Sequence, residues 1–377
     1  MSHSPSQYRV LCFTGSRNIN KRMILFIEGV LTRGMSVRIF SLPRGRWRLD
    51  KSERSLQPVS QQRTSMDLGS SAAATLSAVM CFHWCLLPLA VVTGWWQRVP
   101  VLYDEHDHYE LNTLEGNGSR VRQAFFSLLV RSIHRFCLPW VSLVTCIHMN
   151  ESTLKRHLEK WQSAILELHN YPTQQWRTSR LPNDQTSRLC FVYIGGVFRE
   201  KGPEAAAEAF QLLTLDEQQR AELHIFGDGD ADLIEKLQRT PGVIVHHAVT
   251  PDEFRRFTEG RRCCGLSLLA DTPRYRLVGT NCTKLYEYLA LGMPVIATRV
   301  GEFPQFVSEH NVGLLVNGEM RPAELVEAMQ TLLRNEADYY RMAQNARNLM
   351  NREEMTWESE WRKVEQSGVF DVLRRAA

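Results

Sequence analysis

The chain has 377 residues, 44% hydrophobic and 23% charged, a balance that excludes a disordered chain and a single small domain. The net charge of +4 is uneven, because residues 1–172 carry 20 lysines and arginines against 12 acidic residues. The nine cysteines form no CxxC pair, so the sequence predicts reduced, buried thiols in a cytoplasmic protein and no metal site. No basic segment followed by an apolar one opens the sequence, so we expect no secretory signal.

The first half of the chain alternates short apolar runs with helical segments. We expect strands at residues 9–13, 36–41, 76–82, 99–103 and 143–147, and helices at about 22–32, 85–95, 119–137 and 150–160. The polar residues 43–68 predict a long loop. Residues 72–96 are mostly apolar, but His83 and Pro88 interrupt them, so we expect no membrane-spanning helix.

The second half alternates strand and helix more regularly. Strands are expected at residues 189–194, 223–226, 243–249, 265–269, 295–298 and 313–316, with helices at 203–213, 231–237, from 251, and at 284–291, 302–308 and 322–333. Unalternated apolar strands separated by helices predict a parallel sheet covered on both faces. The sequence therefore predicts an α/β fold of two Rossmann-like, doubly wound halves facing one another across a cleft.

Residues 280–298, TNCTKLYEYLALGMPVIAT, hold the densest signal. Thr283 is a good N-cap, and Gly292 with Pro294 ends a helix of about two turns. A polar loop, a helix N-terminus and a strand in this order form an anion-binding corner of an α/β sheet. Glu287 is placed to accept hydrogen bonds from a pair of ligand hydroxyls. The alternative is an ordinary surface helix in which Glu287 and Lys284 are solvated.

Several segments, taken in order, resemble the retaining glycosyltransferases of family four (glycosyl transferases group 1), which have the two-domain GT-B fold. The matching segments are YDEHD, HNYP, FVYIGGVFREKG, LHIFGDG, TKLYEYLALGMPVIAT and NVGLLVNGE. The resemblance extends from about Arg9 to Leu333. It implies an acceptor-binding domain at residues 1–172, a nucleotide-sugar-binding domain at 173–355, and a helix at 356–377 that crosses back to the first domain.

The resemblance also implies how a nucleotide-sugar donor is held. Lys201 matches a basic residue that binds the diphosphate, whereas Gly196 stands where the family has arginine, and Arg199 is the expected substitute. Glu287 matches the glutamate that binds the ribose, while Gly279 stands in place of a second family glutamate. The remaining expected donor contacts are Thr283, Asn281, Lys284 and Leu285.

In the first domain, His106 matches a catalytic histidine at the end of a strand, where it would stabilise an oxocarbenium-like state. The alternative is a structural His106, hydrogen-bonded among its acidic neighbours. Gly15, Ser16 and Arg17 would form a loop facing the diphosphate or the acceptor. Asp228 and Asp230 are expected to cap a helix rather than to bind a metal.

We therefore expect an enzyme that transfers a sugar from a UDP- or GDP-sugar to a glycan or lipid-linked acceptor in surface polysaccharide biosynthesis. No cofactor, metal or nucleic acid is expected to take part. The basic first half predicts an anionic membrane surface as a partner, with the protein peripheral on the inner face of the membrane. The alternatives are a degenerate, non-catalytic transferase that binds nucleotide-sugar or glycan, and a sugar-nucleotide epimerase of the same fold.

Overall fold

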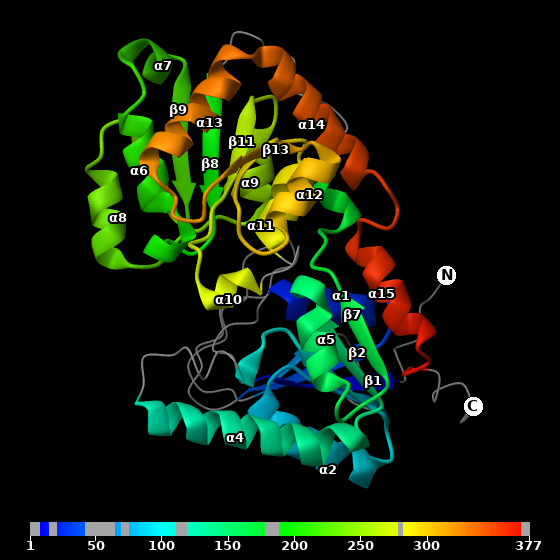
Figure 1. The fold of residues 1–377 in the computed structure, drawn as a ribbon. Coiled ribbons are helices and arrows are strands. Elements are labelled where there is room, and N and C mark those ends of the chain that lie inside the picture. Colours follow the sequence, from blue (N-terminus) through cyan, green and yellow to red (C-terminus); the bar gives the residue numbers. More distant parts are fainter. Residues whose placement is uncertain are drawn as a thin grey trace, which may run out of the picture. The chain divides into compact units, whose positions relative to one another are not determined.

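The computed structural model describes residues 8–14, 21–41, 65–68, 75–110, 119–177, 188–277 and 282–370. The chain divides into two compact units, each built around its own sheet (Figure 1). The first unit comprises the chain up to His169 and again from Trp357 onward, and the second unit is Asn170–Thr356. The predicted α/β class with two Rossmann-like sheets is confirmed.

The first unit contains a seven-stranded sheet in the order β3-β2-β1-β4-β5-β6-β7. The strands are β1 (Tyr8–Thr14), β2 (Ser36–Ser41), β3 (Ser65–Leu68), β4 (Thr75–Cys81), β5 (Val101–Glu105), β6 (Leu143–Ile147) and β7 (Ile165–Leu168). All neighbours pair in parallel except β2 and β3, which are antiparallel. Part of the predicted loop 43–68 is thus wrong, because residues 65–68 pair with β2; the rest of that loop lies outside the described residues.

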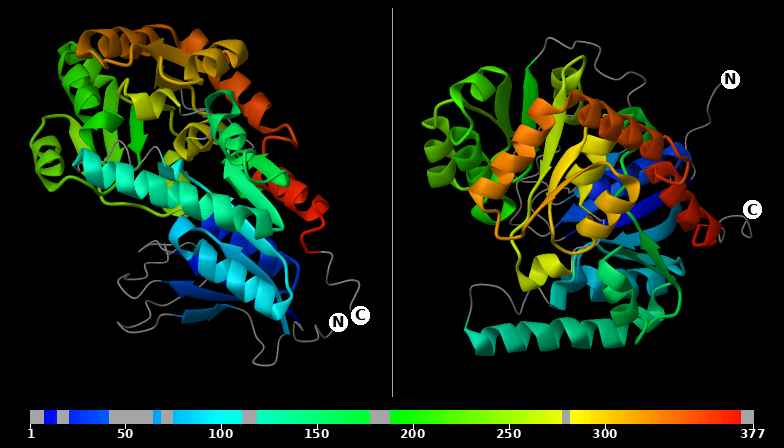
Figure 2. Two further views of the ribbon diagram at one scale, coloured as in Figure 1. Left: turned by 60° about the horizontal axis from the view of Figure 1, so that its bottom comes forward. Right: turned by 45° about the horizontal axis from the view of Figure 1, so that its top comes forward.

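Helices cover both faces of this sheet (Figure 2). They are α1 (Lys21–Thr32), α2 (Leu87–Gln97), α4 (Arg120–Cys137), α5 (Thr153–Leu158) and α15 (Trp357–Gln366), with the 3-10 turns η1 (Trp84–Leu86), η2 (Leu138–Trp140) and η3 (Asn150–Ser152). Ser119 caps α4 by accepting a hydrogen bond from the backbone N–H of Arg122. The helix predicted to start at Asn150 starts later, because Glu151 and Ser152 have positive φ angles.

Helix α15 belongs to the core of the first unit. The rings of Trp357 and Trp361 lie 5.3 and 5.8 Å from the ring of Phe26 on α1. The Trp357 indole donates a hydrogen bond to the Leu25 carbonyl at 3.2 Å. A Cβ on Gly29 would lie 2.4 Å from the Trp361 ring, so only glycine lets α1 approach α15 this closely.

The second unit contains a six-stranded parallel sheet in the order β10-β9-β8-β11-β12-β13. Its strands are β8 (Leu189–Ile194), β9 (Ala221–Phe226), β10 (Val243–His246), β11 (Cys263–Ser267), β12 (Val295–Thr298) and β13 (Gly313–Val316). Its helices are α6 (Pro203–Gln211), α7 (Leu215–Gln219), α8 (Ala231–Gln238), α9 (Pro251–Thr258), α10 (Pro273–Arg276), α11 (Thr283–Ala290), α12 (Phe303–His310), α13 (Pro322–Arg334) and α14 (Glu336–Met350), with η4 (Gln174–Trp176) and η5 (Arg199–Lys201).

Each strand of this sheet divides its side chains between two cores. On β8, Phe191 and Tyr193 pack with residues of α6, α8 and α13. Cys190 and Val192 point to the other face and pack with residues of α9, α11 and α12. Burial on both faces explains why the strands read as continuous apolar runs in the sequence.

Local signals in the sequence fix several helix ends of the second unit. Thr250 and Glu253 form the predicted capping box at the start of α9, with Pro251 in the first turn. Asp230 accepts hydrogen bonds from two backbone N–H groups of α8, which confirms its predicted role as a cap. Across the described segments of both units, no helix combines the length and apolar character needed to span a bilayer.

Candidate functional site

The carboxyl end of β8 carries a tight glycine loop that fixes where a ligand can approach the sheet. The Tyr193 hydroxyl donates a hydrogen bond to the Gly196 carbonyl at 2.6 Å. Gly227 has a φ of +151°, and a Cβ there would lie 1.9 Å from the Gly195 carbonyl oxygen. The loops after β8 and β9 therefore pack backbone against backbone, which only glycine permits at position 227.

Two lysines lie beside this loop. The Lys284 ammonium lies 4.5 Å from the centroid of the Tyr193 ring and 3.5 Å from the Leu268 carbonyl oxygen, and the residue is 8% exposed. The Lys201 ammonium lies 5.2 Å from the Phe198 ring and 3.4 Å from the position of a Cβ on Gly196. A Cβ on Gly196 would lie 2.7 Å from the Phe198 ring, so the glycine at position 196 makes room for that ring.

Burial, together with a smaller effect of the positive charge of Lys201, lowers the pKa of Lys284 to about 8. Both causes disfavour the ammonium form, so a lysine in this position gains from a nearby anion. A diphosphate bound between these two groups would supply that anion. The pair therefore has the electrostatics of an anion-binding corner, as the sequence predicts.

The Arg199 side chain points away from the two lysines and pairs with a carboxylate instead. Its guanidinium Nη1 donates hydrogen bonds of 2.7 and 2.5 Å to the two carboxylate oxygens of Glu204 on α6. The Arg199 side chain is 60% exposed, and Glu204 also accepts a hydrogen bond from Lys236. The structure thus brings Lys201 and Lys284 together, and it ties Arg199 to a surface ion-pair network.

Helix α11 runs from Thr283 to Ala290, one residue earlier than predicted. Its N-cap is Cys282, whose side chain makes no capping hydrogen bond, so the prediction of Thr283 as N-cap is wrong. Lys284 and Glu287 share one face of the helix, being three residues apart. Glu287 is only 7% exposed, which overturns the alternative of a solvated surface helix.

Of the other predicted donor contacts, some lie within the described residues and some do not. Leu285 lies fully buried in the core beneath α11, and its backbone N–H donates to the Cys282 carbonyl at 3.0 Å. Asn281 and Gly279 lie outside the described residues, as do Gly15, Ser16 and Arg17 of the first unit. The sequence did not indicate Tyr193 or Phe198 as neighbours of the lysines, because both read as ordinary apolar residues.

In the first unit, His106 follows β5 directly and is held by two neighbours. Its Nε2 lies 3.0 Å from the Tyr109 hydroxyl, and its Nδ1 lies 3.9 Å from an Asp104 carboxylate oxygen. Asp104 is fully buried, and it accepts hydrogen bonds of 2.9 to 3.0 Å from Arg22 and one of 2.7 Å from Thr145. The imidazole is therefore oriented by a fixed network.

A second histidine lies close to this network. The His83 ring lies 5.2 Å from the Tyr109 ring. Burial lowers the pKa of His83 to about 4, and the charge of His106 acts in the same direction. His83 is therefore neutral near pH 7, and its Nδ1 accepts a hydrogen bond from the Cys85 backbone N–H.

The first unit also has a pocket of about 330 Å³ beside α4 and α5. Its lining residues are His108, Glu110, Arg131, His157, Lys160 and Trp161. Glu110 pairs with Arg131 and, at 3.1 Å, with Nε2 of His157. The charged groups of this pocket thus compensate one another within the unit, and we assign it no part in the reaction.

Residues 175–349 match the family model described as glycosyl transferases group 1. The matched segment covers most of the second unit, including the glycine loop, both lysines and α11. A comparison with curated proteins finds no significant match. The second unit therefore matches the glycosyl transferases group 1 model over most of its length, and this match supports the conclusion that the protein is a glycosyltransferase.

Solved structures of glycosyltransferases share the fold along nearly the whole chain. WaaG, a glycosyltransferase involved in lipopolysaccharide biosynthesis, is 14% identical with a TM-score of 0.61, covering 96% of this chain and 99% of its own. Anabaena HepE in complex with UDP and glucose is 12% identical with a TM-score of 0.64, covering 95% and 98%. Sucrose-phosphate synthase from Thermosynechococcus elongatus is 15% identical with a TM-score of 0.63, covering 98% and 100%. These likenesses confirm the predicted GT-B fold.

Proposed function

We propose that this protein is a retaining glycosyltransferase of family four. It moves a sugar from a UDP- or GDP-sugar to a glycan or lipid-linked acceptor in surface polysaccharide biosynthesis. The observation that carries this proposal is the pair Lys201 and Lys284, buried or half-buried beside a glycine loop at the carboxyl end of β8. Ligands of open α/β sheets bind at this edge.

The chemistry follows from where charge develops during transfer. The barrier includes negative charge that builds up on the departing diphosphate, and positive groups fixed in a poorly solvated place stabilise it most effectively. Lys201 and Lys284 supply that charge, so the reaction needs no metal. Glu287, on the same helix face as Lys284, accepts hydrogen bonds from the ribose hydroxyls. Thr283, Asn281 and the backbone near Leu285 complete the donor contacts, with Arg199 at their margin.

Within this proposal, residues 173–355 bind the nucleotide-sugar and residues 1–172 bind the acceptor. The segment from Trp357 onward belongs to the first unit, and its helix α15 ends at Gln366, earlier than the helix predicted at 356–377; residues 371–377 lie outside the described residues. His106 is the catalytic group of the first unit, and its fixed orientation on Tyr109 and Asp104 suits a group that stabilises an oxocarbenium-like state. Gly15, Ser16 and Arg17 form the loop toward the diphosphate or acceptor.

The relatives favour a UDP-sugar as the first donor to test. HepE is described in complexes with UDP, with UDP-glucose, and with UDP and glucose. WaaG and the galactosyltransferase WaaB act in lipopolysaccharide synthesis according to their descriptions. They support a role in surface polysaccharide assembly by analogy of fold.

Two alternatives share the same fold. A degenerate transferase that binds nucleotide-sugar without turnover is favoured by Gly196 and Gly279, which replace two charged residues of the family. A sugar-nucleotide epimerase would convert the donor without an acceptor. Binding without turnover would favour the first alternative, and a change of the sugar moiety while the nucleotide stays attached would favour the second.

A thermal-shift panel tests donor binding. The protein is heated with UDP-, GDP-, ADP- and dTDP-sugars, and the melting temperature is compared with that of the ligand-free protein. A ligand that binds only the folded state at a concentration of about 100 times its Kd stabilises it by about 2.7 kcal/mol. We expect one nucleotide class to raise the melting temperature, and the Lys201→Ala variant to lose most of that rise.

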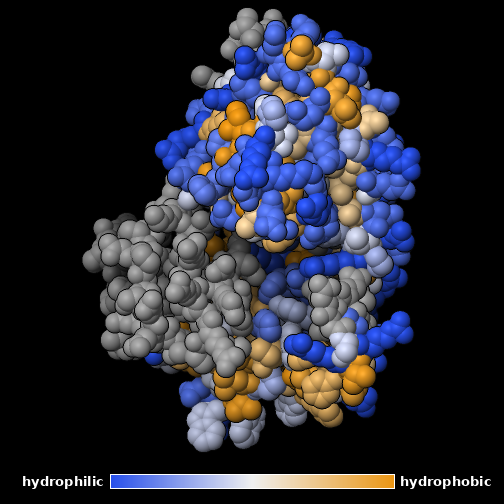
Figure 3. Space-filling model, turned by 90° about the vertical axis from the view of Figure 1, so that its left-hand side faces the viewer, coloured by the Kyte–Doolittle hydropathy of each residue, from blue (hydrophilic) through white to orange (hydrophobic). Residues whose placement is uncertain are grey.

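We further propose that the first unit docks on an anionic lipid surface through α2 and α4. Nine of the thirteen exposed large apolar side chains in the described segments lie on these two helices and the following turn: Leu89, Val92, Trp95, Trp96, Val121, Phe125, Leu128, Phe136 and Trp140. The two helices pack against each other. Figure 3 shows hydrophobic side chains gathered on the surface in the lower part of the view, over the first unit.

The charges around this apolar surface fit an anionic bilayer. Arg120, Arg122, Arg131 and Arg135 on α4 are exposed, and neither helix contains an acidic residue. Exposed aromatic residues beside arginines are typical of helices that lie in a membrane interface. The sequence favoured the basic first half for this role, and its residues 42–64 lie outside the described residues.

Sedimentation with vesicles tests the lipid surface. Wild-type protein should pellet with vesicles that contain phosphatidylglycerol and stay in solution with pure phosphatidylcholine, and salt should weaken the binding. Trp95→Ser with Trp96→Ser, which removes side chains 71% and 74% exposed, should reduce the pelleted fraction by about tenfold. Leu215→Ser, at an exposed leucine of the second unit, is the control. Equal pelleting of the double variant and the wild type would exclude this surface.

A further inference from the structure

Four side chains with metal-binding chemistry meet on one face of the sheet of the second unit. Cys190 on β8 pairs in register with Glu222 on β9 and, on its other side, with Cys263 on β11. His224 lies two residues after Glu222 and so points to the same face. Cys190, Glu222 and Cys263 lie at the amino ends of their strands, at the opposite end of β8 from the glycine loop, and His224 lies near the middle of β9.

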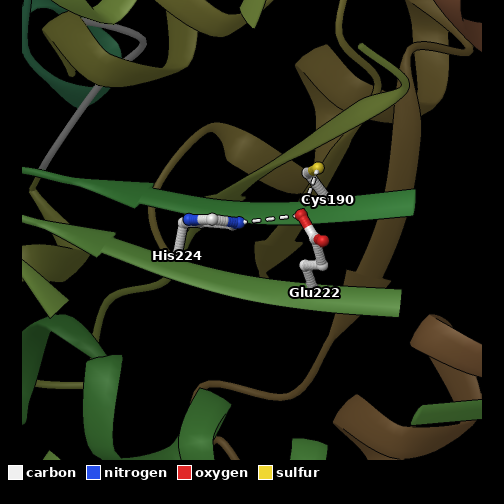
Figure 4. A group of neighbouring side chains, drawn as sticks. All are labelled: Cys190, Glu222 and His224. Carbon is white, nitrogen blue, oxygen red and sulfur yellow. Dashed lines mark hydrogen bonds and ion pairs between the residues drawn. The ribbon is translucent and has the colours of Figure 1, made fainter. Parts of the chain in front are cut away.

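The ligand atoms of three of these residues are close enough to share one ion, and Cys263 lies outside this trio. One atom each from Cys190, Glu222 and His224 lies within 4.8 Å of the other two. His224 Nε2 lies 3.1 Å from a Glu222 carboxylate oxygen, and the Cys190 sulfur lies 3.5 Å from that oxygen. Figure 4 shows the three side chains directed toward one another from the two strands. Within the described ranges, no other trio of such side chains comes this close.

Burial gives the cluster a fixed shape with one opening. Cys190, His224 and Cys263 are buried, whereas the Glu222 side chain is 24% exposed. An ion can therefore approach the cluster past Glu222.

A second contact orients the histidine ring. His224 Nδ1 lies 3.0 Å from Nε2 of His246 on β10. With Nε2 of His224 on a metal, its Nδ1–H donates to His246, which is the outer-shell arrangement that fixes metal-binding histidines in proteins. The pair His224 and His246 thus supplies both the ligand and its support.

The local positive charge does not exclude a cation here. Arg188 and Arg261 each have a guanidinium nitrogen 3.5 Å from Glu222. Their side chains are 59% and 47% exposed, so both can turn into solvent when an ion takes over the carboxylate. Surface ion pairs of this kind contribute little free energy.

We propose that Cys190, His224 and Glu222 bind a zinc ion that stabilises the second unit. A thiolate, an imidazole and a carboxylate match the ligand preference of Zn²⁺, whereas calcium and magnesium prefer oxygen ligands alone. The Cys190 thiol releases its proton to solvent when the ion binds, so no oxidant or reductant takes part. This site lies apart from the residues proposed for donor binding, and it takes no part in the transfer reaction.

Zinc binding is measured on untagged, full-length protein. The protein is stripped with a chelator, and zinc is added back in competition with a chromophoric chelator of known affinity. We expect one zinc ion per chain and a higher melting temperature of the second unit with zinc than without it. Cys190→Ser and His224→Ala should each weaken the affinity by at least about tenfold. Cys264→Ala is the matched control, because this neighbouring thiol packs on the opposite face of the sheet.

Cobalt(II) gives a second readout that does not depend on stability. Thiolate ligation should produce sulfur-to-cobalt charge-transfer absorption in the wild type, and Cys190→Ser should reduce it. Glu222→Gln, at the partly exposed ligand, should fold normally and still lower the zinc affinity. A wild type that binds no zinc would overturn the proposal, as would equal affinity of Cys190→Ser and the wild type, or a Cys190–Cys263 disulfide in freshly purified protein.

Discussion

Replacing Arg22 by methionine is expected to lower the free energy of unfolding of the first unit by about 3–5 kcal/mol. The Arg22 and Asp104 side chains are 5% and 0% exposed, and their guanidinium and carboxylate groups are joined by hydrogen bonds of 2.9 to 3.0 Å. Methionine keeps much of the volume but leaves the Asp104 charge buried, with Thr145 and His106 as its remaining polar partners among the described residues. Denaturant unfolding, followed through tryptophan fluorescence, measures the loss.

Two further variants show whether the loss of stability comes from the unpaired Asp104 charge or from the loss of any arginine. Arg33→Met removes the ion pair between Arg33 and Glu365, whose side chains are both about 30% exposed. The free energy of unfolding should therefore fall by less than about 1 kcal/mol. Arg22→Met combined with Asp104→Leu should recover much of the loss, because no charge stays unpaired. Losses of similar size in Arg22→Met and Arg33→Met would show that Asp104 is not the cause.

Lys201→Ala and Glu287→Ala are each expected to lower turnover of the nucleotide-sugar donor by about tenfold or more, which corresponds to about 1.4 kcal/mol of transition-state stabilisation. The reason differs between the two. Lys201 supplies positive charge where the leaving diphosphate becomes more negative, and Glu287 positions the nucleotide through its ribose. Release of the free nucleoside diphosphate measures turnover, and circular dichroism shows whether each variant is folded.

Lys236→Ala is the matched control for Lys201→Ala. Lys236 carries the same charge within the same unit, but it is half exposed and pairs with Glu204 and Glu208. Its loss should leave turnover within about twofold of the wild type, since exposed ion pairs contribute little. If Lys201→Ala and Glu287→Ala both kept wild-type turnover, the donor-site assignment would be wrong.

Much of the fold could be predicted because its signals are local. Continuous apolar runs such as residues 189–194 mark strands buried on both faces, and Thr250 with Glu253 marks a helix start. The edge strand β3 was missed, because its four residues SMDL carry no apolar pattern and depend on pairing with β2. Helix α14 was also missed, although Asn335 caps its first turn.

The candidate site was only partly predictable, because its contacts join residues distant in sequence. Motif position indicated Lys201, Lys284 and Glu287, but the ring of Tyr193 over Lys284 depends on the packing of α11 against β8. For the same reason, the proposed zinc site could not be predicted from the sequence. Cys190, Glu222 and His224 have no metal-ligand spacing in the sequence, and the register of the parallel strands β8 and β9 brings them together.

The donor panel tests the central claim most directly, because every proposed role in the second unit depends on a bound nucleotide-sugar. We predict that one nucleotide class raises the melting temperature of the wild type in a concentration-dependent way, and that Lys201→Ala removes most of this rise while Lys236→Ala keeps it. No stabilisation by any sugar nucleotide at millimolar concentration, with the protein folded, would contradict the account.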